Sequence, residues 1–308
     1  MIQHGSLRLI FYGAAETYPV KYSKSSGSRL ILQPGSYAMI AYDWIRFMRR
    51  FAVIMPFFSL AAGVAGFYLR IKELADVFNA DTGLPEPGHK LTIMLITLSS
   101  VFLIICLAFS IRGGTKYISR QGFDNAFGTD ALAYPFIFTL FGIIWLGATV
   151  KYFFDMRSSG ELSASLLYFA LLSGLAALSC LLFAVQVYQD PRRKSILALS
   201  VIPILFMCFW LIIMYKQNAT NPILLSYCYY CLAVMASTLS FYYTAGFVFN
   251  KPAPGKAILA YLASIFFCLV TLADEHPTSI KLIFAAVIAV NVVYSSMLIR
   301  NLRIRDAV

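Results

Sequence analysis

Charged side chains are scarce in this sequence. They make up 13% of its 308 residues, whereas 60% of the residues are apolar and the mean hydropathy is +0.74. Soluble globular domains carry about twice that share of charge, so the composition excludes an ordinary soluble domain. It equally excludes a disordered, collagen-like or disulfide-stabilised chain. The class that remains is a multi-pass membrane protein.

Ionisable residues are also missing from the middle of every long apolar run. The three histidines, His4, His89 and His276, all lie outside these runs. A charge deep in the bilayer costs at least about 2.5 kcal/mol and is kept mainly for transport, proton relay or catalysis. Axial haem ligation, an H-E-x-x-H metalloprotease, a carboxylate proton relay and intramembrane proteolysis all lack the residues they require. We therefore expect no catalytic residue, no metal ligand, no cofactor and no enzymatic activity.

Cysteine offers one spacing of interest, the C-x-x-C of Cys228 and Cys231. On a helix both sulfur atoms share one face, as a metal site or a redox pair requires. No histidine or further cysteine lies near them in the sequence, and the surrounding run is apolar. Packing is therefore favoured over metal or redox chemistry as their role.

Eight uncharged apolar runs approach the length of about 20 helical residues that crosses a membrane. They do not alternate between apolar and polar residues as the strands of a β-barrel do. Short connections favour antiparallel pairs of the third run with the fourth, the fifth with the sixth and the seventh with the eighth. The sequence predicts an all-α polytopic membrane protein, a bundle of about eight transmembrane helices arranged largely as antiparallel hairpins. The runs are Phe51–Leu69, Leu91–Ile111, Ala131–Val150, Leu162–Val187, Ser195–Tyr215, Pro222–Phe249, Ala257–Ala273 (the shortest) and Leu282–Ile299.

Basic residues are distributed unevenly about these spans. With the N-terminus in the cytoplasm, the cytoplasmic segments hold 18 of the 25 Lys and Arg residues, with a basic cluster in each of five segments, and the outer loops hold 7. This positive-inside pattern predicts a multi-pass cell-membrane protein with both termini cytoplasmic. Anionic lipid headgroups are the expected partners of the cytoplasmic face. Nucleic acid is not an expected partner, because the charge is spread along one membrane face.

Residues 1–47 precede the first run and contain no predicted span. Met48-Arg49-Arg50 followed by apolar residues is typical of a chain start, with a basic segment before an uncleaved first helix. We therefore divide the chain into an N-terminal extension, residues 1–47, and an eight-helix transmembrane domain, residues 48–308. The extension is expected either to be a disordered cytoplasmic tail or to lie upstream of the true initiator.

Tyrosine is frequent in the sixth run. Tyr227 and Tyr230 lie towards its outer end, and Tyr242 and Tyr243 lie towards its inner end. This distribution is typical of the aromatic belts at the two membrane interfaces. The alternative is that these four side chains, together with Asn291, line a pocket for an amphipathic ligand.

Acidic residues follow two of the runs on the outer side. Glu73 and Asp76 come after the first run, and Asp274 and Glu275 come after the seventh. They are candidates for meeting a cation or a basic ligand. Carboxylates in loops are ordinarily solvated, and that is the expectation for these.

Two further patterns concern helix packing. Small residues four apart, such as Ala233 and Ser237, allow helices to approach closely within the bundle or against a partner. The surroundings of Trp145 recur 65 residues later around Trp210. The recurrence indicates either a duplicated hairpin or a chance match.

Six short segments have a recognisable pattern: Met48-Arg-Arg50, Asp81-Thr-Gly-Leu-Pro85, Asn221-Pro-Ile-Leu-Leu-Ser-Tyr-Cys-Tyr229, Phe241-Tyr-Tyr-Thr-Ala-Gly-Phe-Val-Phe249, Leu272-Ala-Asp274 and Leu298-Ile-Arg-Asn-Leu302. Together they resemble a family of uncharacterised multi-pass membrane proteins from anaerobic Gram-positive bacteria. The resemblance covers most of residues 48–302, whereas residues 1–47 depart from it. It implies a bacterial plasma membrane, and the family has no known function to carry over.

Two functions fit these observations. The first is a non-enzymatic membrane scaffold, sensor or accessory subunit, which associates with itself or with a protein partner through its helix faces. The alternative is a transporter or permease subunit for an apolar or amphipathic small solute, with a route lined by Tyr, Ser, Thr and Asn291. A polar cavity that reaches the middle of the membrane would favour the transporter. A solid apolar interior would exclude it.

Overall fold

The structure is a computed structural model of the whole chain. Two compact units divide the chain, Met1–Phe47 and Met48–Val308, and the helical bundle belongs to the second. The predictions made for residues 1–35 lie outside the described residues, whereas residues 36–47, which we assigned to the extension, form the first part of a helix that continues to Asp76. The described residues are 36–78, 84–86, 88–118, 123–128, 133–160, 163–189 and 195–304.

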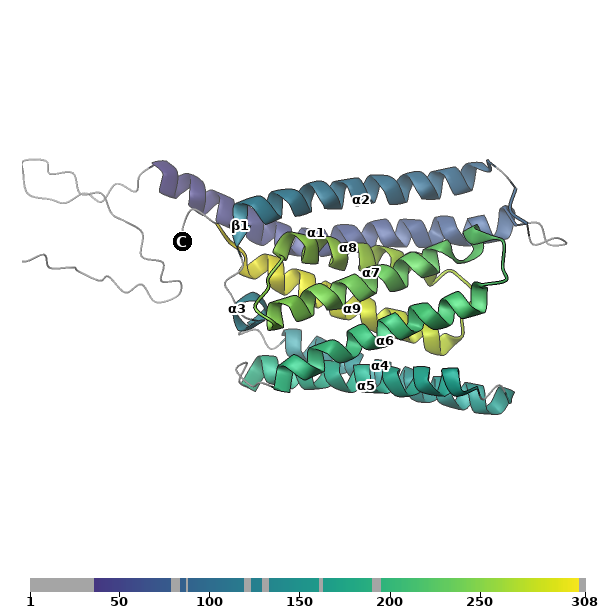
Figure 1. The fold of residues 1–308 in the computed structure, drawn as a ribbon. Coiled ribbons are helices and arrows are strands. Elements are labelled where there is room, and N and C mark those ends of the chain that lie inside the picture. The colour runs from purple at the N-terminus through teal and green to yellow at the C-terminus, as the bar shows by residue number, and fades with distance from the viewer. Residues whose placement is uncertain are drawn as a thin grey trace, which may run out of the picture. The chain divides into compact units, whose positions relative to one another are not determined.

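Eight of the described helices are long and apolar enough to cross a membrane, which confirms the predicted all-α polytopic bundle (Figure 1). A five-residue helix, α3 (Phe123–Phe127), lies between α2 and α4. Strands β1 (Tyr117–Ile118) and β2 (Arg303–Ile304) form a two-residue antiparallel pair. The long helices are α1 (Ser36–Asp76), α2 (Lys90–Lys116), α4 (Ala133–Ser159), α5 (Ala164–Gln189), α6 (Ser195–Asn218), α7 (Leu224–Val248), α8 (Pro254–Thr271) and α9 (Thr278–Asn301).

Helices that follow one another pack as antiparallel hairpins, as predicted: α4 against α5, α6 against α7, and α8 against α9. The turn after α4 is tight because Gly160 adopts a φ of +73°, which residues with a Cβ rarely reach. Small residues lie at the helix contacts. Ala233 and Ser237 of α7 are fully buried, and the Ser237 hydroxyl lies 2.8 Å from that of Ser264 on α8.

Helix α8 is the shortest of the eight and the most enclosed. It has 18 residues, of which 78% are buried, and it packs against α2, α7 and α9. Helix α1 approaches it at Gly63, where an added Cβ would lie 2.6 Å from Cδ1 of Leu269. A helix of this length spans about 27 Å, slightly less than the hydrocarbon core. Protein surrounds α8 on most sides, so it has little lipid thickness to match.

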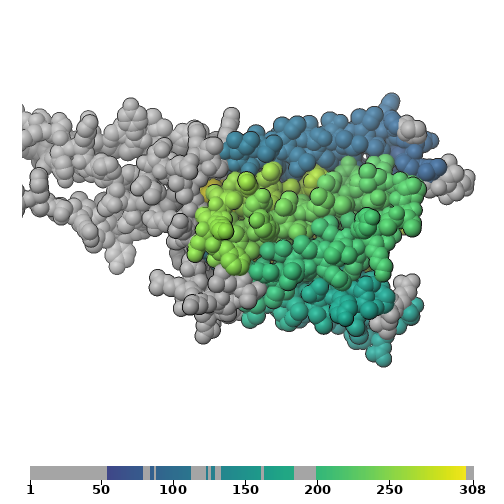
Figure 2. Space-filling view, in the orientation of Figure 1, coloured from purple at the N-terminus to yellow at the C-terminus, as the bar shows by residue number. Residues whose placement is uncertain are grey.

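The outward surface of the bundle is apolar. Figure 2 shows a face that runs from α2 across α7 and α6 to the α4–α5 hairpin. Large apolar side chains are exposed on these helices, including Ile104, which is 66% exposed, and Phe136, which is 69% exposed. An exposed apolar surface of this breadth suits hydrocarbon and not water. The chain is thus an integral, multi-pass membrane protein.

Candidate functional site

Four of the links between long helices lie at the same end of the bundle, because successive helices run in opposite directions. They join α1 to α2, α4 to α5, α6 to α7, and α8 to α9. We call this the vestibule end. An ionic cluster and an open cavity lie side by side there, and both use the link between α8 and α9.

The ionic cluster consists of Arg70, Glu73 and Asp274, and we call it the charge cluster. The Nη1 of Arg70 donates to Oε2 of Glu73 at 2.8 Å, and its Nε donates to Oδ1 of Asp274 at 2.8 Å. Arg70 and Glu73 are fully buried and Asp274 is almost so. Arg70 and Glu73 meet because residues three apart lie on the same face of a helix.

The charge cluster joins three parts of the bundle. Arg70 belongs to α1, and its Nη2 donates to the carbonyl oxygens of Leu225 and Ser226 in the first turn of α7, at 3.3 and 3.1 Å. Asp274 belongs to the link after α8, and its Oδ2 accepts a 2.8 Å hydrogen bond from the Thr271 hydroxyl. The Arg70 guanidinium also lies over the ring of Tyr229, 5.3 Å from the ring centre.

The expectation that Glu73 and Asp274 are solvated loop carboxylates was wrong. Helix α1 does not end at Leu69 but continues to Asp76, so it carries Arg70 and Glu73 into the packed end of the bundle. One guanidinium satisfies two carboxylates, and this pairing makes their burial tolerable. The Oε1 of Glu73 remains without a hydrogen-bond partner among the described residues.

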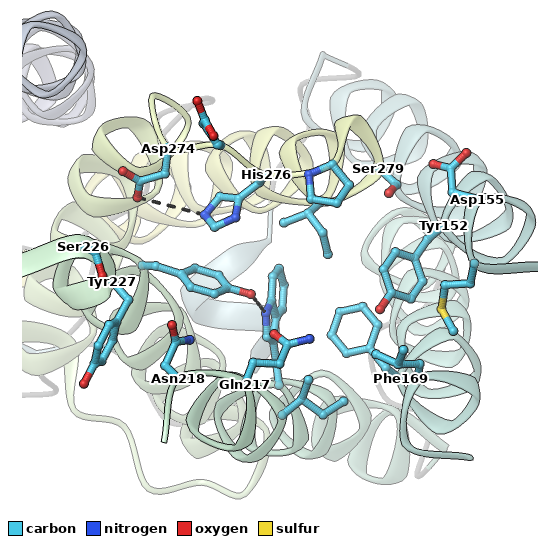
Figure 3. A pocket seen from close by; sticks show the side chains of 18 of the residues that line it. Tyr152, Asp155, Phe169, Gln217, Asn218, Ser226, Tyr227, Asp274, His276 and Ser279 are labelled. Atoms are coloured by element: carbon cyan, nitrogen blue, oxygen red, sulfur yellow. Dashed lines mark hydrogen bonds and ion pairs between the residues drawn. The ribbon is translucent and has the colours of Figure 1, made fainter. Parts of the chain in front are cut away.

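The cavity beside the charge cluster has a volume of about 750 Å³, and we call it the vestibule. Its walls come from the end of α1, α4, α5, α6, α7, the α8–α9 link and the start of α9, most of which Figure 3 shows. Polar side chains surround its mouth, and aromatic side chains line it more deeply. Volume and lining are those of a site for a small organic molecule. The polar lining residues include Asp155, Gln217, Asn218, Asp274, Glu275 and His276.

Five rings follow one another along the vestibule, and we call them the aromatic wall: Tyr152, Phe169, Trp210, Tyr230 and His276. Successive ring centres are 5.0, 5.3, 6.2 and 4.4 Å apart, with steep angles between the ring planes. Such tilted contacts are the favourable geometry for aromatic pairs. The indole N–H of Trp210 donates to the Tyr230 hydroxyl, which fixes both rings (Figure 3).

His276 connects the aromatic wall to the charge cluster. Its Nε2 lies 4.0 Å from Oδ2 of Asp274, which is too long for a hydrogen bond. Burial lowers the pKa of the His276 imidazole below its usual value, and the Asp274 carboxylate only partly opposes this. Lys281 and Arg70 lower the pKa of His276 further through their positive charge. The imidazole is consequently neutral at neutral pH.

Below the aromatic wall the described interior is filled by more rings. Phe206 lies 5.3 Å from Trp210 and 5.9 Å from Trp145, and Trp145 lies 6.3 Å from Phe241. Trp145 and Trp210 are both buried, and each donates its indole N–H to a hydroxyl on the next helix. The vestibule therefore ends on the aromatic wall instead of continuing through the bundle.

A second polar group lies at mid-bundle, and we call it the mid-bundle polar cluster: Ser237, Ser264 and Asn291. The Nδ2 of Asn291 donates to the Ser264 hydroxyl at 3.0 Å, and that hydroxyl lies 2.8 Å from the hydroxyl of Ser237. All three residues are fully buried. The Oδ1 of Asn291 has no hydrogen-bond partner among the described residues.

The structure separates the five residues that the sequence put forward as pocket-lining candidates. Tyr227 and Tyr230 line the vestibule. Tyr242 is exposed on the outside of the bundle, where it contacts the partly buried Tyr243. Asn291 belongs to the mid-bundle polar cluster. The sequence thus brought the correct helix to attention but not the set of residues that share a cavity.

Several vestibule residues escaped the sequence analysis because they come from distant helices. Tyr152 and Phe169 belong to α4 and α5, and His276 to the α8–α9 link. The one available signal was the repeated Trp pattern, since Trp210 is central to the aromatic wall.

The described polar contacts of the C-x-x-C pair are local. Cys228 bonds to the carbonyl oxygen of Leu225, Cys231 contacts Met235, and all six cysteines are free. Among the described residues, no three His, Cys, Asp or Glu side chains gather as they would around a metal ion.

The geometry of this end of the bundle thus offers a small-molecule cavity next to a buried ionic anchor. Comparisons of the chain with protein-family models, with curated protein sequences and with solved structures find no match in any of the three.

Proposed function

We propose that this protein is a non-enzymatic membrane sensor or accessory subunit that binds a small ligand in its vestibule. The observation that carries the proposal is a cavity of about 750 Å³ that ends on the aromatic wall. A cavity that is closed below suits binding and release from one side. The lining comes from seven parts of the bundle, so a ligand seated there would change how these parts pack.

The lining favours binding over catalysis. In sites with an activated nucleophile, the base is usually oriented by a third group within hydrogen-bond reach, and here Oδ2 of Asp274 lies 4.0 Å from Nε2 of His276. Ser279, whose hydroxyl is buried without a hydrogen-bond partner among the described residues, lies apart from His276 on the same side of the cavity in Figure 3. Among the described lining residues, no nucleophile is therefore held against a base.

We further propose that the vestibule faces the cell exterior. The basic clusters of the sequence fall on the opposite side of the spans, and this bias places that side in the cytoplasm together with both termini. A ligand would then arrive from outside the cell. The cell membrane and a bacterial source follow from the family resemblance and are part of the same proposal.

A transporter is the second candidate, and the mid-bundle polar cluster is the observation that favours it. Hydrogen-bonding side chains at membrane depth are expensive and often mark a solute route. Asn291, with one oxygen unpartnered, suits such a route. In this alternative the aromatic wall would open so that the cluster contacts water from one side and then the other.

Cysteine labelling in intact cells separates the two functions. The six native cysteines are replaced, and a single cysteine is introduced by Gln217→Cys in the vestibule or by Ser237→Cys in the mid-bundle polar cluster. A membrane-impermeant thiol reagent should label the first variant from outside and the second from neither side. Labelling of the Ser237→Cys variant would favour the transporter. If the Gln217→Cys variant were labelled only in inverted membrane vesicles, the vestibule would face the cytoplasm, and the proposed orientation would be wrong.

A further inference from the structure

The aromatic wall presents a series of ring surfaces to one cavity. Tyr152, Phe169, Trp210 and Tyr230 come from four different helices and all line the vestibule. The face of an aromatic ring carries partial negative charge and attracts a cation, most strongly when water is excluded. Several rings around one space form the arrangement that binds ammonium groups whose charge is shielded by carbon substituents.

The charged residues around the vestibule also favour a cationic ligand. Three carboxylates line it, those of Asp155, Asp274 and Glu275, whereas no Lys or Arg belongs to its described lining. Lys151 pairs with Asp155 at 3.0 Å on the exposed surface, and Arg70 is held behind Asp274 in the charge cluster. Glu275 is exposed at the mouth. These carboxylates would repel an anionic ligand, and the described lining offers it no Lys or Arg side chain to pair with.

The shape of the site excludes a bare metal ion in favour of an organic cation. Metal ions such as Ca²⁺ and Mg²⁺ need six or more oxygen ligands held close together. Among the described residues no group of three His, Cys, Asp or Glu gathers. The vestibule is instead large and mostly aromatic at its closed end, which suits a molecule with carbon-rich parts.

We infer that the vestibule binds a small organic cation, of the quaternary ammonium class, with its positive group against the rings of Trp210 and Tyr230 and beside the carboxylate of Asp274. The inference rests on the proposed function, because it names the ligand class of the same site. The remainder of the molecule extends along Phe169 towards Asp155. The charge cluster holds Asp274 in place, since Arg70 and Thr271 both bond to it.

Three molecules of nearly equal shape and different charge test the inference. Choline is positive, 3,3-dimethylbutan-1-ol is its uncharged carbon analogue, and 3,3-dimethylbutanoate is negative. Full-length protein in lipid nanodiscs is equilibrated with radiolabelled choline at constant ionic strength, and the other two compounds compete. We expect choline to bind about tenfold more tightly than the alcohol, and the carboxylate not to compete.

Two variants connect the binding to this site. Phe169→Leu removes a ring of the wall and should weaken choline binding about fivefold, whereas Tyr168→Leu, on the exposed side of the same helix, should not change it. Glu275→Gln removes one negative charge at the mouth and should weaken binding of choline about twofold while leaving the alcohol unaffected.

Equal binding of choline and the alcohol would overturn the preference for a cation while leaving a ligand site intact. Absence of choline binding, or choline binding that Phe169→Leu does not change, would also overturn the inference. The cysteine-labelling experiment uses no ligand, so its outcome decides the proposed function separately.

Discussion

At the scale of single residues, one fully buried guanidinium has the most polar contacts to account for among the described side chains. Arg70 makes four polar contacts, two with carboxylates and two with backbone oxygens. Taking a charge out of water is costly, and the cost is offset only where the donors are satisfied in good geometry. A further ion pair among the described residues, Lys151 with Asp155, is exposed and contributes little by comparison.

Arg70→Met should therefore destabilise the folded protein by about 3–5 kcal/mol, because it leaves Glu73 and Asp274 buried with no counterion. Lys151→Met provides the matched control, and its effect should stay within about 1 kcal/mol. Reversible unfolding in detergent, followed by circular dichroism, gives both values. Similar losses of unfolding free energy in the two variants would show that burial does not increase the contribution of the charge cluster to stability.

The stability should also depend on pH through His276. Burial lowers the pKa of its imidazole in the folded protein, so the unfolded chain takes up the proton more readily. Stability then rises with pH up to about 6.5 and is lost on acidification below that value. The unfolding temperature, measured between about pH 5 and 8, should lose part of this slope in His276→Gln but not in His89→Gln. An unchanged slope in His276→Gln would contradict the assignment.

At the scale of helices, small residues allow a neighbouring helix to pack closely against α8. Gly63 of α1 has Leu269 within 2.6 Å of the position of its missing Cβ, whereas Gly147 of α4 has no atom within 4 Å. Close approach between helices is what small residues permit in a membrane, where apolar burial gives little drive for association. Close packing therefore requires a glycine at position 63, whereas no such contact requires one at position 147.

Alanine at these two positions should change stability in opposite directions. Gly63→Ala forces Leu269 to move and should cost about 1–3 kcal/mol. Gly147→Ala meets open space and gains about 0.5–1 kcal/mol from helix propensity. Parallel thermal unfolding of the two variants makes the comparison, and equal effects would mean that α1 does not approach α8 as closely as described.

The helices themselves were predictable, because each is a long apolar run and a bilayer allows few other structures. Their ends were less so. The first apolar run ends at Leu69 because Arg70 is charged, and no local pattern in the sequence indicates that Oδ1 of Asp274 lies 2.8 Å from Nε of Arg70. The charge cluster and the aromatic wall depend on such contacts between distant residues, which a single sequence does not reveal.

At the scale of the whole molecule, the described bundle has an apolar outside, a ring-filled interior and, at the vestibule end, a cavity with a mixed polar and aromatic lining. The absence of charge at mid-span correctly predicted the class of protein. It did not predict which charged residues are buried, because charged side chains at the helix ends point into the bundle as well as towards solvent. Glu73 and Glu275 illustrate the difference: both follow an apolar run, yet the first is buried and the second is exposed.

The position of the charge cluster has a consequence for how the chain is made. Arg70 and Asp274 are 204 residues apart, so at about 5–20 residues per second Arg70 waits roughly 10–40 s for its partner. Glu73, synthesised three residues after Arg70, is the carboxylate at hand throughout that interval. Glu73→Gln should therefore lower the amount of protein that reaches the membrane more than it lowers the unfolding temperature, and Asp76→Asn should do neither. Quantitative immunoblotting and thermal unfolding would measure these two quantities. The order of synthesis would then explain why the charge cluster has a second carboxylate: Glu73 pairs with Arg70 until the last helices have been made.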